Sequence, residues 1–156
     1  MLVGMVANAW AELEHDMVHI ANALLRTSDY RVGKIVMVAA NPPQKRDLLL
    51  AMASLPRWSQ KKRERVQKFC AEFERLRKLR NDIVHGYWDT TVESDPALRL
   101  VRARTELKET ATPRQAKWIM QSFNDIQAAS DAAIELGNYL GTRTLLRRLP
   151  SRRRPH

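Results

Sequence analysis

Arg80, Asn81 and His85 are the residues whose types and spacing fit phosphodiester chemistry. RNA cleavage without a metal ion requires that the 2′-hydroxyl loses a proton, the leaving 5′-oxygen gains one, and the phosphorane charge is stabilised. An imidazole such as that of His85 can move a proton near neutral pH. The guanidinium of Arg80 stays charged and pairs bidentately with phosphate oxygens. The amide of Asn81 could position the phosphate or orient His85, so the three side chains predict a general acid/base site.

A predicted helix over residues 59–85 must position these side chains. Between residues 60 and 79 the sequence has no Gly or Pro, and apolar residues recur at steps of three and four, which marks one buried stripe: Val66, Phe69, Cys70, Phe73 and Leu76. Continuing at about 100° per residue places Arg80 near the middle of that stripe, where a Leu is expected. Asn81 and His85 are four residues apart and share a ridge at its edge. The following glycine ends the helix.

The stretch Arg80-Asn-Asp-Ile-Val-His85-Gly-Tyr87 resembles the Arg-x4–6-His signature of the HEPN superfamily. The resemblance covers roughly residues 73–88. It implies a helical bundle that forms a homodimer, with a metal-independent endoribonuclease site in the cleft between the protomers and no cofactor. A two-fold dimer supplies two copies of each of the three side chains. The products would carry 2′,3′-cyclic phosphate ends.

The longer form Arg-x4-His-x-Tyr looks like the toxin half of HEPN/MNT toxin–antitoxin pairs. In those toxins the matching Tyr is the site at which a partner nucleotidyltransferase attaches AMP. The resemblance therefore implies Tyr87 as a modification site and a nucleotidyltransferase antitoxin as a partner. As an ordinary residue, Tyr87 would begin an extended arm and pack beside Trp88. A stand-alone defence or housekeeping HEPN protein fits the sequence equally well.

Other interpretations of the motif stay open. His85 could bond the last carbonyls of its helix, where a positive charge favours the helix dipole. Arg80 could pair with Glu74 or with an acid on another helix. Superfamily members also exist that bind nucleotide or RNA without cutting it. The alternatives to an endoribonuclease are a non-catalytic RNA- or nucleotide-binding module and a helical interaction protein in which the motif makes a dimer interface.

The charge of the chain indicates a polyanionic partner. Lys and Arg number 27 against 17 acidic residues, which gives a net charge of +10. Such a charge on a small chain usually indicates nucleic acid, although solubility and a basic tail would also account for it. We expect RNA phosphates to be contacted by Arg57, Lys61, Lys62, Arg77, Arg102, Arg147, Arg148, Arg152, Arg153 and Arg154.

The sequence excludes several other classes. No apolar run approaches about 18 residues, so we expect no membrane span. No basic region precedes the apolar start, so we expect no signal peptide and place the chain in the cytoplasm. The single cysteine, Cys70, fits a core residue in a reducing compartment. His15 and His19 are four residues apart but lack a third ligand, so we expect an exposed helix face and no metal.

The predicted fold is all-α: a bundle of about five helices, with a small β-hairpin inserted after the motif helix. An a/d-like seam predicts a helix over residues 2–26. A cap at Ser28 and Asp29 favours a helix over a strand for the apolar stretch that follows, Tyr30–Ala40. The third helix, Gln44–Leu55, is expected to face inward with Leu48, Leu49, Met52 and Leu55.

The second half of the chain is predicted to contain the hairpin and the last helix. Residues 87–92 and 98–104 are short β-prone runs separated by the turn residues 93–96. Thr112 and Pro113 are typical of an N-cap and the first position of a long final helix. Residues 1–142 then form one helical domain, and residues 143–156 form a basic tail that is expected to be disordered alone.

Overall fold

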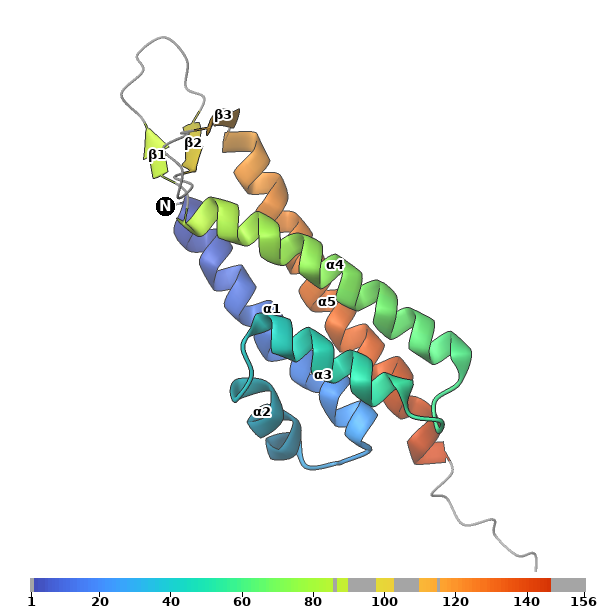
Figure 1. Ribbon diagram of the computed structural model, residues 1–156. Coiled ribbons are helices and arrows are strands. Elements are labelled where there is room, and N and C mark those ends of the chain that lie inside the picture. Colours follow the sequence, from blue (N-terminus) through green and yellow to red (C-terminus); the bar gives the residue numbers. More distant parts are fainter. Residues whose placement is uncertain (1, 86, 90–97, 103–109, 115, 147–156) are drawn as a thin grey trace, which may run out of the picture.

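Five helices make up most of the described part of the chain, as predicted for a helical bundle. The computed structural model describes residues 2–85, 87–89, 98–102, 110–114 and 116–146. The helices are α1 (Leu2–Leu25), α2 (Tyr30–Val38), α3 (Pro42–Ser54), α4 (Gln60–His85) and α5 (Ala116–Leu146). Figure 1 shows α1, α4 and α5 as long helices that run side by side, with the shorter α2 and α3 along one side.

The core lies where the apolar stripes of the three long helices meet. The predicted seam of α1 is buried from Val6 to Leu24, and the stripe of α4 is buried from Val66 to Leu76. The ring of Trp10 on α1 stacks on that of Phe73 on α4, with ring centroids 4.9 Å apart. Burial of these side chains supplies the main stabilisation of the bundle.

One glycine sets the distance between α1 and α5. A Cβ atom on Gly137 would lie 2.8 Å from the backbone carbon of His19 and 2.7 Å from its Cβ. Because backbone atoms of a packed helix cannot move aside cheaply, this close approach requires a residue without a side chain. The final helix is therefore held against α1 by its smallest residue.

Side-chain caps begin the two short helices. Asp29 caps α2, since its carboxylate accepts from the backbone N–H of Arg31, as predicted. Asn41 and Gln44 form a reciprocal capping box at the start of α3. The third helix was expected to begin at Gln44, but it begins at Pro42, because the two prolines occupy its first turn, where no N–H is needed.

The buried face of α3 differs from the predicted one. Lys45, Leu49 and Ala53 are buried, whereas Leu48 and Leu55 are 37% and 41% exposed. Lys45 can occupy a core position because its ammonium donates to Glu14 of α1 at 2.9 Å. The sequence pattern did not indicate that ion pair, which allows Lys45 to take an inward position on α3 while Leu48 faces outward.

Three short strands follow the motif helix: β1 (Tyr87–Asp89), β2 (Leu98–Arg102) and β3 (Thr110–Arg114). They pair antiparallel in the order β1-β2-β3. The turn of the predicted hairpin, residues 93–96, lies outside the described residues, so that hairpin stays a prediction. Thr112 and Pro113 were expected to begin the last helix, but they lie in β3, and α5 begins at Ala116.

The helix α5 continues to Leu146, four residues past the predicted end of the helical domain at residue 142. The rest of the predicted tail, residues 147–156, lies outside the described residues. Within the described residues, no helix combines the length and the apolar character needed to cross a membrane.

Candidate functional site

The structure brings Arg80, Asn81 and His85 together at the C-terminal end of α4. Nη1 of Arg80 donates to Oδ1 of Asn81 at 3.0 Å and lies 3.2 Å from Nε2 of His85. Arg80 and Asn81 are half-buried, and His85 is exposed. The predicted convergence of a cation, an amide and an imidazole is thus found within one protomer.

Arg80 forms no ion pair with the residues that the structure describes. Glu74, the acid proposed as its partner, is bound instead by Arg77 through two hydrogen bonds of 2.9 and 2.7 Å and by Arg46 at 3.3 Å. The Arg77 guanidinium holds the pKa of the Glu74 carboxyl below its ordinary value. Since Glu74 is engaged elsewhere, the positive charge of Arg80 has no carboxylate to neutralise it in this part of the chain.

The contact between Arg80 and His85 places a donor group beside a ring nitrogen. A guanidinium carries donors only, so a hydrogen bond between the two requires the tautomer of His85 in which Nε2 accepts and Nδ1 carries the proton. In that tautomer the imidazole can act as a general base, and the neighbouring cation can stabilise a phosphate that approaches the same place.

The other side of Arg80 faces a pocket with a volume of about 460 Å³. Its walls come from three helices: α1, the start of α3, and α4. Nε of Arg80 is buried and has no hydrogen-bond partner among the described residues. The pocket is lined by Ala7, Trp10, Ala11, Glu14, Pro42, Pro43, Arg77, Arg80 and Asn81.

Four residues that line the pocket were not predicted as site residues: Trp10, Glu14, Pro42 and Pro43. These residues meet Arg80 because α1 and α3 pack on α4. The single local signal was the polar Glu14, which follows Trp10 by one helical turn and accepts the hydrogen bond of its indole N–H at 2.9 Å.

The first predicted phosphate contacts lie at the opposite end of α4. At roughly 1.5 Å per residue, Lys61 is about 28 Å from Arg80 along the helix axis. Arg57 is exposed and donates to the carbonyl of Leu24, near the end of α1. Figure 1 shows that α5 ends at this end of the bundle, while the strands lie at the other. Arg57 and Lys61 therefore do not form one surface with Arg80.

Lys62 was predicted to contact phosphate, and the structure contradicts this prediction. It is only 8% exposed, and its Nζ donates to the carbonyl of Leu140 on α5 at 2.8 Å. The ammonium also lies 5.0 Å from the ring centroid of Trp58 and 5.7 Å from that of Tyr139. Since these contacts occupy the ammonium inside the bundle, Lys62 joins α4 to α5.

The remaining predicted residues lie in other positions, and some lie outside the described residues. Arg77 lines the pocket and is held by Glu74. Arg102 lies in β2 opposite Thr110, and Tyr87 begins β1 opposite Val101. The structure does not describe the side chains of either. The tail residues Arg147, Arg148, Arg152, Arg153 and Arg154 lie outside the described residues, so their RNA contacts stay predictions.

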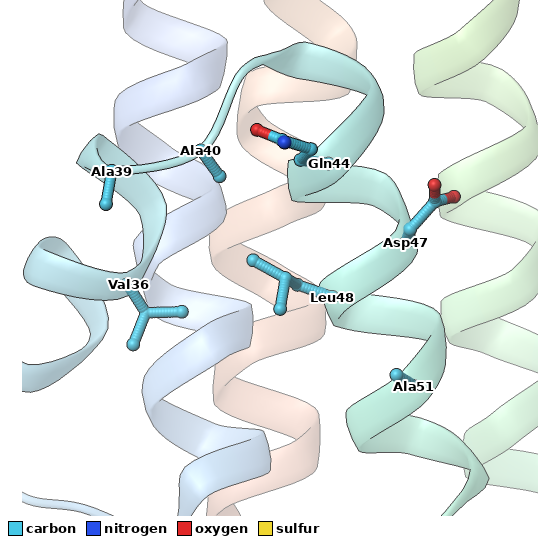
Figure 2. A pocket seen from close by; sticks show the side chains of 7 residues that line it. All are labelled: Val36, Ala39, Ala40, Gln44, Asp47, Leu48 and Ala51. Carbon is cyan, nitrogen blue, oxygen red and sulfur yellow. The ribbon is translucent and has the colours of Figure 1, made fainter.

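A second hollow lies between α2 and α3 and contains none of the predicted site residues. It has a volume of about 520 Å³ and is mostly apolar. Figure 2 shows Val36 of α2 and Leu48 of α3 on its two sides, with Gln44 and Asp47 along α3. The lining residues of this hollow include no Lys or Arg that could neutralise a phosphate.

No protein-family model, curated protein or solved structure matches this chain. The resemblance to the HEPN superfamily accordingly rests on the sequence motif from Arg80 to Tyr87.

Proposed function

We propose that this chain is a metal-independent endoribonuclease of HEPN type. The observation that supports the proposal most is the 3.2 Å separation between Nη1 of Arg80 and Nε2 of His85. An imidazole lies beside a guanidinium that has no acidic partner among the described residues, and these are the two groups that metal-independent phosphodiester cleavage uses. In the proposed reaction His85 moves protons, Arg80 stabilises the phosphorane charge, and Asn81 holds the guanidinium in place.

The reaction breaks the bond between phosphorus and the 5′-oxygen. A general base removes the proton of the 2′-hydroxyl, the 2′-oxygen attacks phosphorus, and a general acid protonates the departing 5′-oxygen. The fragments then end in a 2′,3′-cyclic phosphate and a 5′-hydroxyl. One protomer supplies one His85 for the two proton transfers, so we propose that a homodimer supplies a second His85 across a shared cleft.

The dimer can be tested apart from the chemistry. We expect light scattering at micromolar concentration to give twice the mass of the chain. A monomer under these conditions would contradict the shared cleft.

The proposed biological setting is a toxin or defence RNase. If the chain is the toxin of a pair, a nucleotidyltransferase antitoxin would attach AMP to the hydroxyl of Tyr87. The mass of the chain would then rise by about 329 Da.

The decisive experiment is cleavage of end-labelled RNA in excess EDTA. We expect fragments whose masses show 2′,3′-cyclic phosphate ends, and no cutting at a position that carries a 2′-deoxyribose. His15→Ala is the matched control, because this exposed histidine lies on α1 and contacts Tyr30 instead of the site. RNA that is bound but never cut would contradict the proposal and support a non-catalytic binding module. If the RNA is neither bound nor cut, the hypothesis that remains is a helical interaction protein.

A further inference from the structure

The pocket beside Arg80 has the size and the wall composition of a small-molecule site. Its volume of about 460 Å³ falls within the range of roughly 300–1,000 Å³ that is usual for ligand pockets. Ala7 and Ala11 leave space along α1, and the rings of Pro42 and Pro43 form an apolar wall at the start of α3. A flat ring can lie between such walls while polar groups contact its edge.

Glu14 is the acidic residue among those that line this pocket. Its Oε1 accepts from Nε1 of Trp10 and its Oε2 accepts from Nζ of Lys45, both at 2.9 Å. These two bonds hold the carboxylate in place. Each carboxylate oxygen has two acceptor positions, so one position remains on each. The carboxylate therefore keeps one acceptor position on each oxygen for a ligand.

The charges around the pocket leave one cation without a partner. Glu14 pairs with Lys45, and Glu74 pairs with Arg77. Arg80 has no ion pair among the described residues and has a buried Nε without a hydrogen-bond partner. One phosphodiester carries one negative charge, which Arg80 can neutralise. The pocket thus combines a place for an anion with a carboxylate that accepts two hydrogen bonds.

We infer that this pocket binds the guanine base of a nucleotide whose phosphate lies at Arg80. Guanine presents two adjacent donors, N1–H and N2–H, which match the two remaining acceptor positions of Glu14. Adenine presents an acceptor at N1, which the carboxylate repels. The amide of Asn81 also lines the pocket, and its Nδ2 makes no hydrogen bond to a described residue, so it can donate to O6 of guanine.

The inference deepens the proposed function, on which it rests, by naming the base beside the phosphate that is cut. RNA cleavage would then occur next to guanosine, because the base anchors the nucleotide while its phosphate lies between Arg80 and His85. Reading a single-stranded base along its Watson–Crick edge is common in RNA recognition. With another base the carboxylate of Glu14 would not receive the two hydrogen bonds that guanine donates, so that base would bind much more weakly.

Calorimetric titration with guanosine, inosine and adenosine monophosphates tests the pocket without any cleavage. Each is used with its phosphate on the 3′ or the 5′ oxygen. We expect the guanosine nucleotide to bind most tightly and the inosine nucleotide, which lacks the N2 amino group, to bind about tenfold more weakly. The adenosine nucleotide should bind more weakly still. Equal affinities, or no binding of the guanosine nucleotide, would overturn the inference.

Three variants test the position of the binding site. Ala11→Leu fills the pocket from an exposed position of α1 and leaves Glu14 intact, so binding should fall at least about tenfold while the melting temperature stays the same. Ala71→Leu makes the same change at an exposed position of α4 outside the pocket and should not affect binding. Glu14→Gln should remove the preference for guanosine over adenosine. Binding that survives Ala11→Leu would place the nucleotide elsewhere and overturn the assignment.

The pocket and the endoribonuclease can fail separately. If RNA is cut in EDTA without regard to the neighbouring base, the guanine pocket is wrong and the endoribonuclease stands. If guanosine monophosphate binds and Ala11→Leu abolishes the binding but no RNA is cut, the pocket stands and the endoribonuclease is wrong.

Discussion

Nη1 of Arg80 lies 3.2 Å from Nε2 of His85, although the two residues are five positions apart on α4. Residues at that spacing point in different directions from a helix, since each step turns the chain by about 100°. The contact forms because the arginine side chain is long and His85 is the last residue of the helix. The helix end thereby brings a donor-only group to an acceptor nitrogen of the imidazole.

Replacing Arg80 separates its charge from its shape. Arg80→Lys keeps the charge but loses the bidentate fork, so we expect cleavage to fall by about 10²-fold or more. Arg80→Leu should remove cleavage while the free energy of unfolding is unchanged or higher, because Arg80 has a buried Nε without a partner. Urea unfolding measures the second effect, and Arg31→Lys at an exposed position of α2 is the control. Collapse of the fold in Arg80→Leu would instead make Arg80 a structural residue.

His85→Ala should reduce cleavage by about 10²–10⁴-fold, the usual contribution of general acid–base help. Asn81→Ala should reduce it less, since Asn81 contacts the guanidinium and moves no proton. Single-turnover rates on one RNA substrate compare the two variants. His85 is exposed, so its replacement should leave the urea midpoint in place. A larger loss in Asn81→Ala than in His85→Ala would reverse the assigned roles.

Lys61 and Lys62 are neighbours in sequence with opposite expected effects. Lys62→Met leaves the carbonyl of Leu140 without its buried donor, so we expect a loss of about 1–3 kcal/mol in the free energy of unfolding. Lys61→Ala removes an exposed charge and should change that free energy by less than about 0.5 kcal/mol. If Lys61 contacts RNA, its removal should flatten the salt dependence of binding by about 0.7 per contact. Equal stability of the two variants would contradict the structural role of Lys62.

Gly137→Ala should destabilise the bundle by about 1–3 kcal/mol, because its Cβ would press against the backbone of His19. Gly141→Ala is a matched control on the same helix, since a Cβ there meets nothing within 4 Å. That control should be neutral or more stable by about 0.5–1 kcal/mol, because alanine favours a helix. Thermal unfolding of both variants tests the close approach of α1 and α5, and two equal melting temperatures would argue against it.

Cys70 should resist alkylation in the folded protein. Burial raises the pKa of its thiol to about 12, and the reactive form of cysteine is the thiolate. Below that pKa the thiol stays protonated, so iodoacetamide at pH 8 should label the folded chain far more slowly than the chain in urea. Mass spectrometry over time measures both rates. Equal rates would show that Cys70 is accessible.

The sequence by itself determined the helices and the placement of the motif. Apolar steps of three and four depend only on helix geometry, so they correctly predicted α1 and the stripe of α4 that ends near Arg80. The cap at Ser28 and Asp29 correctly favoured a helix for α2. The motif residues lie within the last two turns of one helix, and the long side chain of Arg80 can reach Asn81 and His85 without a contact from another element. Their meeting at the end of α4 was therefore predictable.

The tertiary structure alone decided which polar residues are buried and what surrounds Arg80. Lys45 and Lys62 carry charges that sequence patterns assign to the surface. Inside the bundle, however, their ammonium groups donate to Glu14 and to the carbonyl of Leu140. Those partners lie on other helices, so no local pattern could reveal them. The pocket formed for the same reason: Glu14, distant in sequence from Arg80, reaches it only because packing of the apolar stripes sets α1 and α3 against α4.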